Sequence, residues 1–115
     1  MPSMSTASRA YGMASEHRGI RQQEAEVFRL TIARLRAARH DGPIARVRAL
    51  ADNRRLWMVV SDLMRDIDNS LPLDLRASIL SVGLTVQREM DRDEPDFDFL
   101  ITINTHIAEG LSAAG

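Results

Sequence analysis

The fold is decided by a long stretch in the middle of the chain, PIARVRALADNRRLWMVVSDLMRDID (residues 43–68). Its apolar residues recur every three or four positions, which is the pattern of a helix that buries one face. Pro43 suits a first helical turn, and Asn69 with Ser70 ends the pattern. We therefore predict one helix here. Its predicted buried stripe is Ile44, Val47, Leu50, Trp57, Val60, Met64 and Ile67.

A polar residue shares the apolar side of this predicted helix. Asn53 lies at helical spacing from Trp57 and Val60, and a buried amide without a hydrogen-bond partner costs about 1–3 kcal/mol. Trp57 is either the largest residue of the core or a contact for a binding partner, because Trp and Arg are enriched at such contacts. The spacing favours the core.

Three further helices are predicted around this stretch, over residues 21–40, 72–91 and 96–112. Links rich in Gly, Pro and Asp separate them, and no run alternates with the period of a β-strand. Gly83, inside the third helix, would be explained by a close helix crossing or by simple tolerance. The apolar face of the first helix is predicted to be Phe28, Thr31, Ile32 and Leu35.

These elements predict an all-α fold, because short links between helices favour antiparallel neighbours. We expect a small single domain that resembles a four-helix bundle over residues 19–115, after a flexible N-terminal tail over residues 1–18. The predicted structural core contains Trp57, Val60, Ile79, Val82 and Ile101.

Charge is unevenly distributed, and all fifteen basic residues are arginine. Residues 1–55 hold eleven Arg and five acidic residues, whereas residues 56–115 hold four Arg and eleven acidic residues. This polarity predicts either pairing between the two halves or oriented docking on a partner. We favour pairing within the chain.

Several classes of function lack their usual signals. The chain has no cysteine, which excludes disulfides, thiolate catalysis and cysteine zinc sites. His17, His40 and His106 lack metal-ligand spacing, and the run Asp91–Asp98 lacks the Gly that a calcium loop needs at its sixth position. We expect no catalytic, cofactor-binding or metal-binding residues, and no enzyme.

The sequence lacks the apolar segments that direct a protein into or across a membrane. No apolar run reaches the length of a membrane span or a signal peptide, so we expect a cytoplasmic protein that does not bind membranes. Direct nucleic-acid binding is not expected, because no aromatic residue between Phe28 and Trp57 is available to stack on bases.

A partner surface is suggested by a second apolar side on the two central helices. Leu56, Met58, Val59 and Leu63 lie off the Trp57 face, and Leu80 and Leu84 lie off the Ile79 face. Exposed apolar residues of this kind mark interaction sites, although two helices buried on all sides would give the same pattern. The predicted partner-binding residues are Arg54, Leu56, Val59, Leu63, Arg76 and Leu80.

Residues 10–111 resemble the bacterial flagellar FlaF family. The likeness is strong in Asn53-Arg54-Arg55-Leu56-Trp57 with Asp62-Leu63. It continues through Asn69-Ser70-Leu71-Pro72 and Leu75-Arg76-Ala77 to Leu100-Ile101-Thr102-Ile103-Asn104. The chain departs from the family pattern in two places. A bulkier residue is usual near Gly83 or Leu84, and the run after Val86 is acidic here rather than basic and aromatic.

The resemblance implies a role in flagellum biogenesis. Proteins of this family support the production and export of flagellin, and are thought to act as chaperones for its terminal amphipathic helices. The resemblance also names the translation regulator FlbT as a second candidate partner. An alternative function is a regulatory adaptor of flagellin mRNA translation, which acts with FlbT or contacts RNA.

Overall fold

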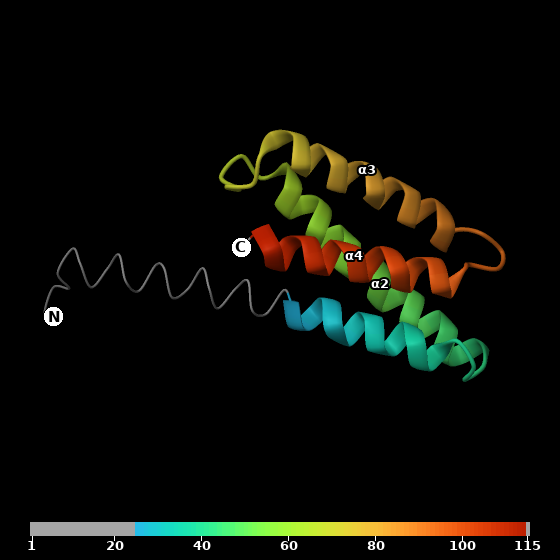
Figure 1. Cartoon of the computed structure of the whole chain (residues 1–115). Coiled ribbons are helices and arrows are strands. Elements are labelled where there is room, and N and C mark those ends of the chain that lie inside the picture. Colours follow the sequence, from blue (N-terminus) through green and yellow to red (C-terminus); the bar gives the residue numbers. More distant parts are fainter. Residues whose placement is uncertain (1–24, 115) are drawn as a thin grey trace, which may run out of the picture.

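The computed structural model describes residues 25–114, and these residues form four helices (Figure 1). The first helix spans residues 25–38, and it is followed by α2 (Pro43–Arg65), α3 (Leu73–Met90) and α4 (Phe97–Ala114). The described residues contain no strand. The predicted all-α fold is confirmed, while the predicted tail over residues 1–18 lies outside the described residues.

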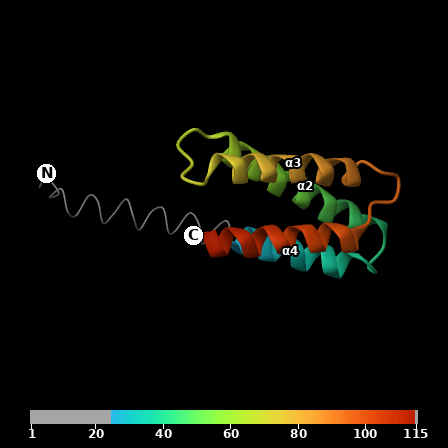
Figure 2. The ribbon, with the colours of Figure 1, turned by 45° about the horizontal axis from the view of Figure 1, so that its top comes forward.

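The helices run up and down through short links. Successive helices are antiparallel, and α3 packs against both α2 and α4. The α4 helix lies along the first helix in both views, and the N-terminal end of α2 lies at the same end of the molecule as the acidic link before α4 (Figures 1 and 2). A core shared by all four helices follows from this arrangement.

The core contains most of the residues that the sequence places there. Phe28, Thr31, Ile32 and Leu35 of the first helix are buried. The predicted core residues Trp57, Val60, Ile79 and Ile101 are buried, and Val82 is partly buried against them.

The predicted buried stripe of α2 is wrong at its two ends. Ile44, Val47 and Ile67 are exposed, and Ile67 lies beyond the last helical residue, Arg65. Two steps of three residues carry a side chain about 120° around a helix, so Ile44 cannot share a face with Leu50. The buried face instead holds Ala49, Asn53, Leu56, Trp57, Val60 and Met64.

The end of α2 depends on side chains that follow it. The Asn69 Nδ2 atom donates a hydrogen bond of 2.8 Å to the Leu63 carbonyl oxygen, and the Arg76 side chain donates to the Asp66 carbonyl at 3.0 Å. Because the last carbonyls of a helix have no partner within it, such donors favour termination at this point. The helix therefore stops three residues before the end that its apolar pattern predicts.

Gly83 marks the close crossing of α2 and α3. A Cβ atom at this position would lie 3.2 Å from Cε3 of Trp57 and 3.5 Å from the Ser61 hydroxyl. The buried glycine thus admits the indole ring against the backbone of α3. Of the two explanations that the sequence allows, the close crossing is the one observed.

A chain of buried polar side chains joins α2, α3 and α4. Trp57 Nε1 donates to Asn104 Oδ1 at 2.9 Å, and Asn104 Nδ2 donates to Asn53 Oδ1 at 2.7 Å. Asn53 Nδ2 in turn approaches the Met90 sulfur at 3.2 Å. Both asparagines are fully buried, so the amide partner that Asn53 requires is supplied by Asn104.

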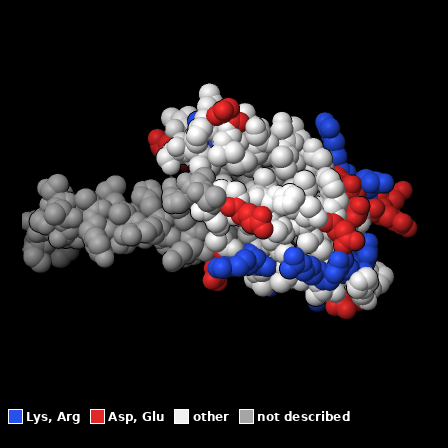
Figure 3. Space-filling model, viewed as in Figure 1, with Lys and Arg blue, Asp and Glu red and all other residues white. Residues whose placement is uncertain are grey.

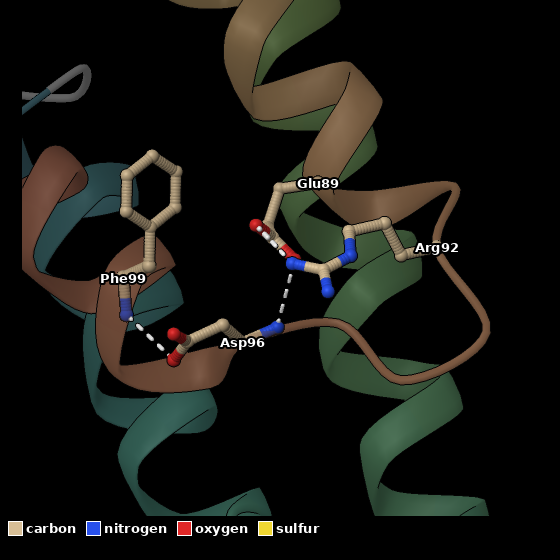
Figure 4. Close-up of polar contacts among 4 residues, drawn as sticks. All are labelled: Glu89, Arg92, Asp96 and Phe99. Atoms are coloured by element: carbon tan, nitrogen blue, oxygen red, sulfur yellow. Dashed lines mark hydrogen bonds and ion pairs between the residues drawn. The ribbon is translucent and has the colours of Figure 1, made fainter.

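The acidic link between α3 and α4 organises the start of α4 (Figure 4). Asp96 Oδ1 accepts a hydrogen bond of 3.1 Å from the backbone N–H of Phe99, as an N-cap does. Glu89 Oε2 accepts from the Asp96 backbone N–H and from Arg92, both at 3.1 Å. The Asp96 carboxylate of the link therefore caps α4, and the Glu89 carboxylate from the last turn of α3 fixes the backbone of Asp96.

We expect Asp96→Ala to lower the free energy of unfolding by about 1 kcal/mol, because the loss of an N-cap costs roughly that amount. Asp93→Ala is the matched control, since it removes a carboxylate from the same link and Asp93 caps no helix. Urea denaturation followed by circular dichroism measures both. Equal stability of the two variants would contradict the capping role.

Among residues 25–114, two ion pairs join the basic half of the chain to the acidic half. Arg39 contacts Asp98 at 2.6 Å, and Arg54 contacts Asp91 at 2.8 Å. Both pairs lie at the end of the bundle that carries the acidic link, where arginines and carboxylates gather in Figure 3. Pairing between the halves is therefore present, although it uses only part of the charge.

Candidate partner-binding surface

Three of the predicted partner contacts are leucines that belong to the core or its margin. Leu56 is 4% exposed, so its prediction as a surface contact is wrong. Leu63 and Leu80 are partly buried and pack against the core. Leu56 follows Asn53 by three residues and precedes Val60 by four, which places it on the buried face of α2. Among the predicted apolar contacts, Val59 alone is mostly exposed, at 54%.

The two predicted partner-binding arginines form hydrogen bonds within the bundle. Arg54 donates to Asp91 at 2.8 Å and to the Met90 carbonyl at 3.1 Å, which ties α2 to the end of α3. Arg76 donates to the Asp66 carbonyl at the end of α2. Charge reversal at either position would disturb the fold as well as a surface, so neither arginine is a clean probe of partner binding.

An exposed apolar stripe runs along the solvent side of α2. Ile44, Val47 and Met58 are 71%, 66% and 67% exposed, and Ala51 lies between them and is half-buried. The spacings of three, four and seven residues place the four side chains on one face of the helix. We call these four residues the α2 outer stripe.

The sequence contained the signal for this stripe. The residues at 44, 47, 51 and 58 satisfy helical spacing as well as the core residues do, so α2 has two apolar faces. The predicted buried stripe combined Ile44 and Val47 of the exposed face with Trp57, Val60 and Met64 of the buried face. The sequence also predicts a second apolar side on α2, and that prediction shares only Met58 with the observed stripe.

An open groove of about 500 Å³ lies beside the stripe, between the first helix and α2. Small side chains line much of it, among them Ala37, Ala45 and Ala51. Arg34 from the first helix and Arg48 and Arg55 from α2 line it as well. Asp52 accepts from Arg34 at 3.1 Å and lies 3.7 Å from Arg55.

The described residues show neither a metal site nor a membrane helix. Within residues 25–114, no three His, Asp or Glu side chains are grouped so that they could hold a metal ion. No helix in this range is long and apolar enough to cross a membrane.

The comparison with protein families decides the identity of the chain. The family model described as flagellar protein FlaF matches residues 7–111. The chain belongs to the FlaF family. Neither the curated proteins nor the solved structures contain a match to it. Membership of the FlaF family makes this a flagellar protein.

Proposed function

We propose that this FlaF-family protein is a non-enzymatic cytoplasmic chaperone that binds flagellin and supports its production and export. The observation that supports the proposal is the α2 outer stripe, on which three large apolar side chains are each about two-thirds exposed. Apolar residues that follow one helix face without cover from their own bundle are typical of a surface that meets a partner.

The chemistry of the stripe suits the segments of flagellin that the family resemblance implies as its target. An amphipathic helix docks by placing residues at i, i+3, i+4 and i+7 against an apolar surface. The α2 outer stripe has the same spacing, so it can pack side by side with such a helix. Covering these segments would keep flagellin from assembling before export.

We expect the purified protein and monomeric flagellin to form a stoichiometric complex at micromolar concentration, measured by size-exclusion chromatography. Met58→Glu is expected to weaken this complex, because it replaces an exposed apolar side chain at the C-terminal end of the stripe with a charge. Thr102→Glu on α4 is the control, since Thr102 is exposed on another helix. Separate elution of the two folded wild-type proteins would contradict the proposal.

A second candidate function is regulation of flagellin mRNA translation, through FlbT or through RNA. The arginines beside the stripe favour it, since arginine binds phosphate. A gel shift of flagellin leader RNA at low salt would support direct RNA contact. Co-elution with FlbT in the absence of flagellin would support the adaptor.

A further inference from the structure

We infer that the α2 outer stripe and the neighbouring groove form one docking surface for an amphipathic helix that carries acidic residues along one flank. The inference rests on the proposed function for the identity of the partner, and adds which surface binds and what chemistry it selects. The apolar ridge of the partner would lie over the stripe, and its acidic flank over the arginines of the groove.

The apolar and basic residues are arranged in parallel along α2. Arg48 and Arg55 are seven residues apart, which is two helical turns, and both are exposed. Val47 and Met58 of the stripe lie beside them on the same solvent side of the helix. A partner helix packed along α2 would therefore meet an apolar row and a basic row together.

Exposed apolar residues continue beyond the groove on the side away from the α2 N-terminus. Arg34 and Asp52 are paired across the two antiparallel helices. Val27 precedes Arg34 by two turns and Val59 follows Asp52 by two turns, so both valines lie at one level along the pair. They are 48% and 54% exposed, which extends the apolar surface along the length of α2.

The charge of the groove favours an acidic partner. Three arginines line it, but only two carboxylates do, Asp41 and Asp52. Asp52 is shared by Arg34 and Arg55, and Arg48 forms no ion pair with any described residue. A carboxylate on the partner would provide the missing partner for Arg48.

Two other occupants fit this surface less well. The segment over residues 1–24 contains three Arg and two Glu, so it has no excess of acidic charge to offer. A nucleic acid fits less well because no aromatic side chain lines the groove to stack on a base. An acidic helix satisfies the apolar and the basic rows at once.

The first test locates the bound partner. The natural chain has no cysteine, so a single cysteine can carry a benzophenone photo-crosslinker at one chosen site. Ala37→Cys places it in the groove, and Thr102→Cys places it on the exposed side of α4. With monomeric flagellin we expect a crosslink from position 37 and not from position 102. A complex that crosslinks only from position 102 would overturn the docking surface and leave the chaperone function intact.

The second test measures the charge selection without flagellin. The probes are two synthetic amphipathic helical peptides of about 20 residues. Both have the same apolar face of Leu and Ala, and one carries Glu along its flank where the other carries Lys. We expect the wild-type protein to bind the Glu helix at least about tenfold more tightly than the Lys helix, with a preference that falls as salt rises. Equal affinity for the two peptides would overturn the inference whatever flagellin does.

Charge reversal assigns this preference to the groove. The double variant Arg48→Glu, Arg55→Glu is expected to lose the preference for the Glu helix. Arg88→Glu is the control and is expected to retain it, because Arg88 is exposed on α3 and lies outside the groove. Circular dichroism confirms that each variant is folded. A double variant that keeps the preference would place the acidic contacts elsewhere. A second copy of the chain as the occupant would appear instead as a dimer in sedimentation, and would also overturn the inference.

Discussion

Trp57→Ala is expected to lower the free energy of unfolding by about 3–5 kcal/mol, which is the usual cost of truncating a buried large aromatic residue. The indole is 4% exposed and lies against the backbone of α3 at Gly83. Its removal leaves a void between α2 and α3, because the surrounding structure relaxes only partly into the vacated space. Thermal unfolding followed by circular dichroism measures the loss.

Met58→Ala is the control for this prediction, because Met58 is the next residue of the same helix and is 67% exposed. Surface substitutions of this kind change stability by about 0.5 kcal/mol or less. If Trp57→Ala were no more harmful than Met58→Ala, the indole would not be the centre of the packing. Binding assays on Trp57 variants therefore report folding before they report a partner contact.

Asn104→Leu is expected to lower the free energy of unfolding by about 2–6 kcal/mol, although leucine has a similar size and is the more apolar residue. The substitution removes the acceptor of the Trp57 indole N–H and the donor to Asn53. Each buried polar group that is left without a partner costs about 1–3 kcal/mol. Urea denaturation of the purified variant measures the change.

His106→Leu provides the comparison on the same helix, since His106 is exposed. It makes the same kind of change, from a polar residue to leucine, and we expect little effect on stability. An Asn104→Leu variant as stable as the wild type would contradict the prediction. It would show that the buried asparagines contribute no net stability.

The sequence predicted the helices because their information is local. Periodic apolar residues, Pro43 at a helix start and Asp96 before α4 each act within a few positions. The burial of Asn53 could also be predicted, since its neighbours on one helical side are apolar. Its partner Asn104 could not, because the two amides are 51 residues apart and meet only where the side chains of α2 and α4 reach each other across the core.

The surface was harder to predict than the core. Leu56 and Met58 are two positions apart and both apolar, yet one is buried and the other exposed. Which of two apolar faces turns inward depends on where the neighbouring helices lie, and here small residues, Ala38 and Ala49, are buried where the first helix meets α2. Alanine is only weakly apolar, so the sequence pattern assigns the buried face to the larger side chains of Ile44 and Val47 instead.

The single tryptophan gives this protein a built-in optical reporter. Its indole is buried where α2, α3 and α4 meet and donates its N–H to Asn104. The emission should therefore be shifted to short wavelength in the native state and move to longer wavelength when the three helices separate. A ligand that covers only the solvent side of α2 should leave this spectrum unchanged, so the intrinsic fluorescence separates docking from remodelling without any added dye.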